Sequence, residues 1–184
     1  KKNTAPAILS SALIKEIPNN QPMIFITSDN LIEKNKKFNK YVFSSKKHLN
    51  NNNIFIFGIK PITPSSEYGY FLTKKISNNI NKVVKFIEKP NKSKVKIIIK
   101  KKGYMNAGMF FARKDSLINN FKRHQPQIFK NCYEAVNKAN RIKNLYYLKR
   151  DSFKKVKEIS FDYAILEKAK NINGIKMNLS LTDL

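Results

Sequence analysis

Short, almost continuously apolar runs recur along the chain, each too short for a typical helix but long enough for a buried strand. They cover residues 23–27, 54–59, 83–87, 104–111 and 175–179. Apolar side chains with the three- and four-residue spacing of helices cover residues 4–17, 38–49, 116–121, 128–139 and 160–169. Strands that alternate with helices predict an α/β domain with a mostly parallel sheet flanked by helices.

Charged residues directly follow several of the apolar runs. Asp29, the pair Glu88-Lys89 and Asp183 each come just after a strand-like segment. In α/β sheets, ligands bind outside the carboxyl ends of the strands. The pattern therefore predicts that three acids and one lysine converge on one edge of the sheet.

The net charge of +25 is the feature that most suggests a nucleic-acid partner. Only four of the 37 basic residues are arginine, whose planar fork suits bases and phosphates best. The lysines are spread over the whole chain, and asparagine and isoleucine are also abundant, which is typical of A/T-rich coding sequence. Nucleic acid is therefore not the favoured partner. A non-catalytic basic protein that binds RNA or anionic surfaces, or a decayed gene product, stays open as the alternative.

The length of 184 residues and the apolar share of 41% suit one domain with a real core. No apolar run approaches the roughly 20 residues that cross a bilayer, and the start of the chain carries no secretion pattern. Cys132 is the only cysteine, which excludes an internal disulfide. We therefore expect a cytoplasmic protein with no membrane partner.

Seven short motifs occur between residue 2 and the end of the chain. They are Lys-Asn-Thr-Ala-Pro-Ala-Ile at 2–8, Ile-Thr-Ser-Asp-Asn at 26–30, Gly-Ile-Lys-Pro at 58–61 with Tyr-Gly-Tyr at 68–70, Phe-Ile-Glu-Lys-Pro at 86–90, Asn-Ala-Gly-Met-Phe at 106–110, Ser-Phe-Asp-Tyr-Ala-Ile-Leu-Glu at 160–167 and Ser-Leu-Thr-Asp-Leu at 180–184. In order and in content they resemble the motifs of the mannose-1-phosphate guanylyltransferases, the sugar-phosphate nucleotidylyltransferases that make GDP-mannose.

The resemblance implies a nucleotide-diphospho-sugar transferase-like (Rossmann-like) fold, with residues 1–184 as a partial nucleotidyltransferase domain. The glycine-rich opening segment of that family would lie before Lys1, together with the first strand of the sheet. We therefore expect an incomplete sheet edge with exposed apolar surface. Turnover is expected to be impaired, or to need a separately encoded N-terminal fragment.

The chemistry implied by the resemblance is transfer of GMP from GTP to mannose 1-phosphate, with release of pyrophosphate. Bringing two polyanions together calls for Mg²⁺ and cationic side chains rather than acid–base catalysis. Asp29 and Asp183 match the positions that the family uses for Mg²⁺, and Asp29 and Lys89 are the implied catalytic residues. The alternative for each Asp is a local turn bond at a strand end.

The resemblance also assigns substrate contacts. The implied sugar-phosphate ligands are Glu88, Lys89, Asn106, Gly69, Gly108 and Asp162, and the implied nucleotide ligands are Asn3 and Thr4. Each has a plainer alternative. Lys89 can be one more solvated lysine, either glycine can serve a turn or bulge, and Asp162 can stabilise the start of its helix. Asn3 and Thr4 can simply cap the first helix.

Overall fold

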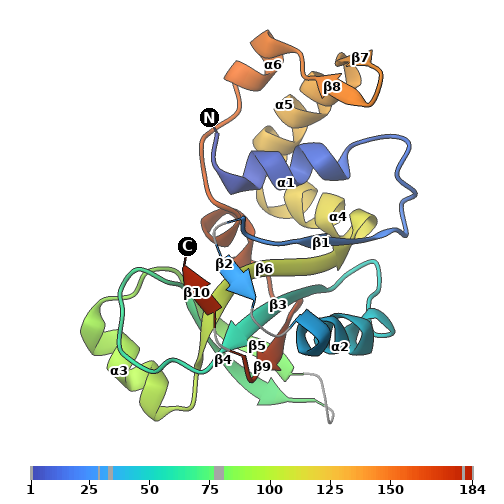
Figure 1. The fold of residues 1–184 in the computed structure, drawn as a ribbon. Helices are drawn as coiled ribbons and strands as arrows, with labels where there is room; N and C mark the ends of the chain where they lie inside the picture. Colours follow the sequence, from blue (N-terminus) through green and yellow to red (C-terminus); the bar gives the residue numbers. More distant parts are fainter. Residues whose placement is uncertain (1, 29, 33–34, 77–80, 180, 184) are drawn as a thin grey trace.

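The computed structural model describes residues 2–28, 30–32, 35–76, 81–179 and 181–183 (Figure 1). The helices are α1 (Thr4–Ala12), α2 (Asn35–Lys46), α3 (Lys92–Lys100), α4 (Lys114–His124), α5 (Pro126–Asn137), α6 (Arg150–Lys154) and a π-helical turn, η1 (Asp162–Leu166). The strands are β1 (Pro22–Phe25), β2 (Asn30–Ile32), β3 (Ile54–Ile59), β4 (Tyr70–Lys75), β5 (Asn81–Ile87), β6 (Tyr104–Arg113), β7 (Asn140–Ile142), β8 (Leu145–Tyr147), β9 (Ile172–Met177) and β10 (Leu181–Asp183). None of the described helices has the length and hydrophobicity needed to cross a bilayer.

The main sheet has six strands in the order β1-β6-β3-β9-β5-β4, and β4 also pairs with one end of β6. Only the pairing of β3 with β9 is parallel, and the other described pairings of this sheet are antiparallel. The prediction of a mostly parallel sheet was therefore wrong. Its premise was the alternation of strands with helices, whereas the continuous apolar runs show only that both faces of a strand are covered. They do not fix the direction of the neighbouring strand.

Helices cover both faces of this sheet. Helices α1, α4 and α5 form one layer above β1 and β6, while α2 packs on the opposite face (Figure 1). On the first side, Phe161 is fully buried, and its ring lies 4.6 Å from that of Phe110 and 5.9 Å from that of Phe121. On the second side, Phe38 of α2 packs on Phe57 of β3 with ring centroids 5.5 Å apart. The α/β class with helices on both faces is therefore confirmed.

Several predicted elements were found, with shifted ends. Strand β3 covers residues 54–59, as predicted, whereas α1 ends at Ala12 instead of residue 17. The helix expected over residues 160–169 is reduced to the π-helical turn η1. Strand β4, helix α3 and the β7–β8 hairpin were not predicted, and in α3 lysines interrupt the apolar pattern.

Lys114 fastens the segment between α1 and β1 to the start of α4. Its side chain is only 4% exposed, and its Nζ donates to the carbonyl oxygens of Ile14 at 2.8 Å and Ile17 at 2.6 Å. Burial lowers the pKa of this ammonium group. We expect Lys114→Met to reduce the free energy of unfolding by about 1–3 kcal/mol, because two carbonyls lose a charged donor.

Thermal unfolding followed by circular dichroism measures this effect. The exposed Lys96 of α3 provides the control, and Lys96→Met should change stability by no more than about 0.5 kcal/mol. Equal shifts for the two variants would show that the Lys114 bonds add nothing.

Candidate functional site

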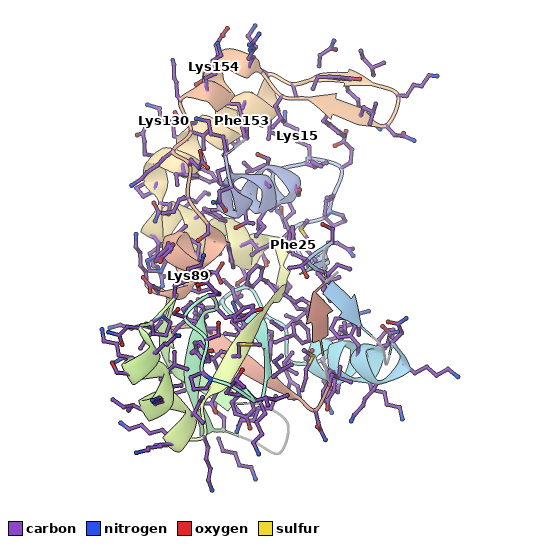
Figure 2. The ribbon with its side chains drawn as sticks, turned by 60° about the vertical axis from the view of Figure 1, so that its left-hand side comes forward. Lys15, Phe25, Lys89, Lys130, Phe153 and Lys154 are labelled. Atoms are coloured by element: carbon purple, nitrogen blue, oxygen red, sulfur yellow. The ribbon has the colours of Figure 1, made fainter. Side chains whose placement is uncertain are left out.

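The turn that follows β5 forms one wall of the candidate site. Strand β5 ends at Ile87, and Glu88, Lys89 and Pro90 reverse the chain before α3. Lys89 has a φ of 44°, a left-handed conformation that is unusual for a lysine. The backbone N–H of Glu88 donates to Oε1 of Glu167 at 2.9 Å. Lys89 lies where the helical layer meets α3 and the sheet (Figure 2).

Strand β6 supplies the second wall through Asn106, which is 7% exposed. Its backbone N–H donates to the carbonyl oxygen of Gly69 at 2.8 Å, and its Nδ2 donates to Oδ1 of Asp162 at 2.8 Å. The pairing of β6 with β3 shifts between Asn106 and Phe110, and Gly108 within this bulge has a φ of 69°. The bulge and the positive φ therefore explain why a glycine stands at position 108.

The π-helical turn η1 contacts both walls of the site, β6 through Asp162 and the turn after β5 through Glu167. In an α-helix, residues 162 and 167 would point about 140° apart at roughly 100° per residue. Here the N–H of Glu167 donates to the carbonyl oxygen of Asp162 at 3.0 Å, the i to i+5 bond of a π-turn. As a result, the Asp162 carboxylate reaches Asn106 of β6 while the Glu167 carboxylate reaches the backbone of Glu88 after β5.

Three carboxyl groups therefore gather in a chain that has only 12 acidic residues. Burial, and then the charge of Asp162, raise the pKa of Glu88 to about 7. Burial also raises the pKa of Asp162 to about 6, against the bond from Asn106. Oε2 of Glu88 is buried and has no hydrogen-bond partner among the described residues. A buried acceptor of this kind calls for a donor from outside the protein, such as a hydroxyl group.

The lack of a side chain at Gly69 leaves room for the carboxyl group of Glu88. A Cβ atom at position 69 would lie closer than any real contact to Oε2 of Glu88 and 2.9 Å from the ring of Phe86. Any larger residue would therefore push the Glu88 carboxyl out of place. The role of Gly69 is thus explained by close packing beside an acidic side chain.

The raised pKa of Glu88 predicts a pH-dependent loss of stability. Because the folded-state pKa of about 7 lies above the ordinary 4.5, its contribution to stability is intact below pH 4.5 and is lost as the pH rises through 7. We expect Glu88→Gln to raise the unfolding midpoint at pH 8, by about 2–4 °C for a gain of about 1 kcal/mol, and to change it little at pH 5.

Midpoints measured at pH 5 and pH 8 test this expectation. The exposed Glu67 provides the matched control, and Glu67→Gln should leave both midpoints unchanged. A Glu88→Gln protein that is less stable than the parent at pH 8 would contradict the inference that the ionised Glu88 carboxylate destabilises the folded state.

Asn3 and Thr4 lie at the start of α1. Oδ1 of Asn3 accepts the backbone N–H of Thr4 at 2.8 Å, so Asn3 caps the helix. Oγ1 of Thr4 accepts the backbone N–H of Phe161 at 2.9 Å. Thr4 also lines a cavity of about 380 Å³, whose other lining residues are Ala7, Ile8, Ser11, Phe25, Ile26, Thr27, Ser28, Gly108 and Phe110. Thr4 and Gly108 therefore share this cavity between α1 and the end of β1.

A family profile, that of the nucleotidyl transferases, matches residues 1–153. The chain belongs to the nucleotidyl transferase family. It is 31% identical over its full length to a mannose-1-phosphate guanylyltransferase of Escherichia coli, and 30% identical to one of Salmonella typhimurium. The chain spans about two fifths of these curated relatives, 41% and 39% of their lengths.

Two solved structures have a fold similar to that of the chain. A structure titled mannose-6-phosphate isomerase from Helicobacter pylori matches 99% of the chain with a TM-score of 0.88 and 26% identity, over 71% of its own length. A structure titled mannose-1-phosphate geranyltransferase from Thermus thermophilus matches with a TM-score of 0.86 at 19% identity, over 52% of its length. The chain therefore shares the fold of these two structures.

The two predicted metal ligands are placed only in part. Asp29 lies outside the described residues, and only the backbone is described for Asp183. Strand β10 pairs with β2 so that residue 183 lies opposite residue 30. The pairing therefore brings the chain around Asp183 to the segment that follows Asp29. Among the residues that the structure describes, no three His, Cys, Asp or Glu side chains form a metal cluster.

The structure brings together most of the residues predicted for the sugar-phosphate side. Glu88, Lys89, Gly69, Asn106 and Asp162 are linked through the contacts given above. Glu167 was missed as a site residue, although it belongs to one of the seven motifs. A separation of five residues from Asp162 does not match any face of an α-helix, so only the π-turn reveals its position.

Proposed function

We propose that this chain carries the sugar-phosphate half of a mannose-1-phosphate guanylyltransferase reaction, the transfer of GMP from GTP to mannose 1-phosphate. The observation that carries the proposal is the buried Oε2 of Glu88, which has no hydrogen-bond partner among the described residues, beside Lys89 and the Asn106–Asp162 pair. Carboxylate oxygens and a side-chain amide that lie together can form hydrogen bonds with sugar hydroxyl groups, and the neighbouring lysine can pair with a phosphate. The relatives of this chain with that name support the choice of substrate.

The proposed mechanism is in-line displacement at phosphorus. An oxygen of the sugar 1-phosphate attacks the α-phosphorus of GTP, the new P–O bond forms, and the bond to pyrophosphate breaks. Lys89 offsets the charge of the sugar phosphate, while Glu88 and Asp162 accept hydrogen bonds from sugar hydroxyls and Asn106 orients Asp162. The cavity beside Thr4 and Gly108 is the proposed place for the nucleotide.

Asp29 and Asp183 are the proposed Mg²⁺ ligands. Carboxylates at strand ends suit this ion, and the pairing of β2 with β10 fits a shared site. Bound there, Mg²⁺ would neutralise phosphate charge as the two substrates approach. We further propose a cytoplasmic location for the reaction, as the single cysteine led us to expect.

Turnover is proposed to depend on a further segment at one edge of the main sheet. Strand β1 lies at that edge, and Ile24 within it and Ile26 just after it are 40% and 59% exposed. The resemblance assigns the triphosphate cradle to a glycine-rich segment and a further strand. We propose that such a segment pairs with β1 and completes the nucleotide side.

Conversion of radiolabelled GTP to GDP-mannose tests the proposed function. The glycine-rich segment is supplied in the assay as a fragment of an Escherichia coli relative. Product should form with Mg²⁺ and mannose 1-phosphate, and removal of Mg²⁺ by EDTA should abolish it. Asp183→Asn should lower the rate at least 100-fold, because one carboxylate ligand loses its charge. Product formation that survives both EDTA and Asp183→Asn would contradict the metal assignment, and its absence under all conditions would contradict the transfer reaction.

A further inference from the structure

A second cavity, of about 560 Å³, lies on the outer side of the candidate site. It opens between β5 and the segment that connects η1 to β9. Its lining residues are Lys82, Val83, Val84, Lys85, Phe86, Leu166, Glu167, Lys168, Ala169 and Lys170. We call this cavity the lysine groove. The sugar-phosphate assignment does not use it.

The groove exists because β5 diverges from its neighbour. Strand β5 pairs with β9 through Asn81 and Lys82, and in the described register this pairing goes no further. A bulge follows at Val84, since Thr73 of β4 pairs with Val83 while Leu72 pairs with Lys85. The extra residue turns both Val84 and Lys85 outward, in place of the alternation of a regular strand. Bulges of this kind often serve to aim side chains at a ligand.

The floor and the rim of the groove differ in chemistry. The floor is apolar, with Val83, Phe86 and Leu166 at 8%, 9% and 1% exposed, and Val84 contributes an exposed side chain beside them. The rim consists of the exposed lysines, Lys82 and Lys85 from β5 and Lys168 and Lys170 from the η1–β9 connection, together with the exposed Glu167.

Lysine is the most frequent residue type in the groove lining. Four of the ten lining residues are lysine, whereas lysine makes up less than a fifth of the chain. The lining acid, Glu167, already accepts the Glu88 N–H through Oε1. The groove therefore presents an excess of positive charge around an apolar floor.

We infer that the lysine groove binds a small organic phosphate, with its phosphoryl group between the lysines of the two sides and a ring or alkyl group on the Val83–Phe86–Leu166 floor. Lysine is a common phosphate ligand that acts as a point charge, and four flexible ammonium groups can follow a phosphoryl group of any orientation. The apolar part distinguishes this ligand from inorganic phosphate. The volume of the groove suits a molecule of that size.

Phenyl phosphate is the probe for this site, titrated into the full chain by isothermal calorimetry at constant ionic strength. Saturating mannose 1-phosphate in the cell keeps the probe from the candidate sugar site. We expect saturable binding with one probe per chain, and at least about 10-fold weaker binding of inorganic phosphate, because only the phenyl ring reaches the floor.

Two matched double variants separate the groove from the general charge of the protein. Lys85→Gln with Lys168→Gln removes one lysine from each side of the rim, whereas Lys94→Gln with Lys96→Gln removes two exposed lysines from α3. Both lower the net charge by two. The first pair should weaken phenyl phosphate binding at least about 10-fold and the second less than two-fold.

Three results would overturn the inference. They are the absence of saturable binding, equal affinities for phenyl phosphate and inorganic phosphate, and equal losses in the two double variants. Unfolding midpoints of both variants within about 1 °C of the parent would show that the losses report the groove and not the fold, since exposed lysines rarely affect stability. If the Lys85/Lys168 variant proves less stable, the single Lys170→Gln variant repeats the comparison on the same rim.

Discussion

Glu88→Ala and Lys89→Ala should each weaken the binding of mannose 1-phosphate by about 100-fold. Oε2 of Glu88 is a buried acceptor without a partner among the described residues, and Lys89 is the cation in the turn beside it. Truncating one partner of a buried, charged hydrogen bond costs about 2–5 kcal/mol, which corresponds to roughly 30-fold or more in affinity. Calorimetric titration with mannose 1-phosphate measures both variants directly.

Lys157 and Glu158, which follow one another in the sequence, provide the control for these two variants. Both side chains are exposed and lie outside the candidate site, so Lys157→Ala and Glu158→Ala should leave the affinity within about two-fold. If neither Glu88→Ala nor Lys89→Ala changes the affinity, the sugar-phosphate assignment is wrong.

The second large effect concerns Phe161, which joins the core to the candidate site. Its ring is fully buried against Phe110 and Phe121, and its backbone N–H donates to Thr4. We expect Phe161→Ala to remove about 3–5 kcal/mol of stability and to lower the unfolding midpoint by about 10–15 °C. Because Asp162 is the next residue, this variant should also bind the sugar phosphate more weakly at temperatures where it is still folded.

Tyr163 tests whether burial accounts for that loss. Its side chain is 43% exposed on the same turn, so Tyr163→Ala should reduce stability by about 1 kcal/mol or less. Differential scanning calorimetry compares the two variants under identical conditions. A midpoint for Phe161→Ala within about 3 °C of the parent would contradict the central place that the structure gives this ring.

The sequence was sufficient to predict several of the buried strands and several of the residues that lie together in the candidate site. The run 54–59 is strand β3, and the motif residues Glu88, Asn106 and Asp162 lie close together in the fold. The direction of the strands could not be read in the same way. A continuous apolar strand is covered on both faces whether its neighbours are parallel or antiparallel, so the periodicity carries no information on direction.

The parts that were missed depend on long-range geometry. The π-turn brings Glu167, five residues after Asp162, to the backbone of Glu88, which lies 79 positions away in sequence. The bulge at Val84 turns Lys85 toward the lysine groove, and no local pattern in a lysine-rich chain marks that lysine among the 33. In a chain this rich in lysine, the composition did not indicate which charged residues the fold brings together.

Calorimetric titration of the unmodified chain with mannose 1-phosphate in the presence of Mg²⁺ tests the proposed sugar-phosphate site. We expect saturable binding of one molecule per chain, with the affinity reduced by both Glu88→Ala and Lys89→Ala. A folded chain that shows no heat of binding to mannose 1-phosphate, or one that binds it equally well after both substitutions, would show that the proposed site is wrong.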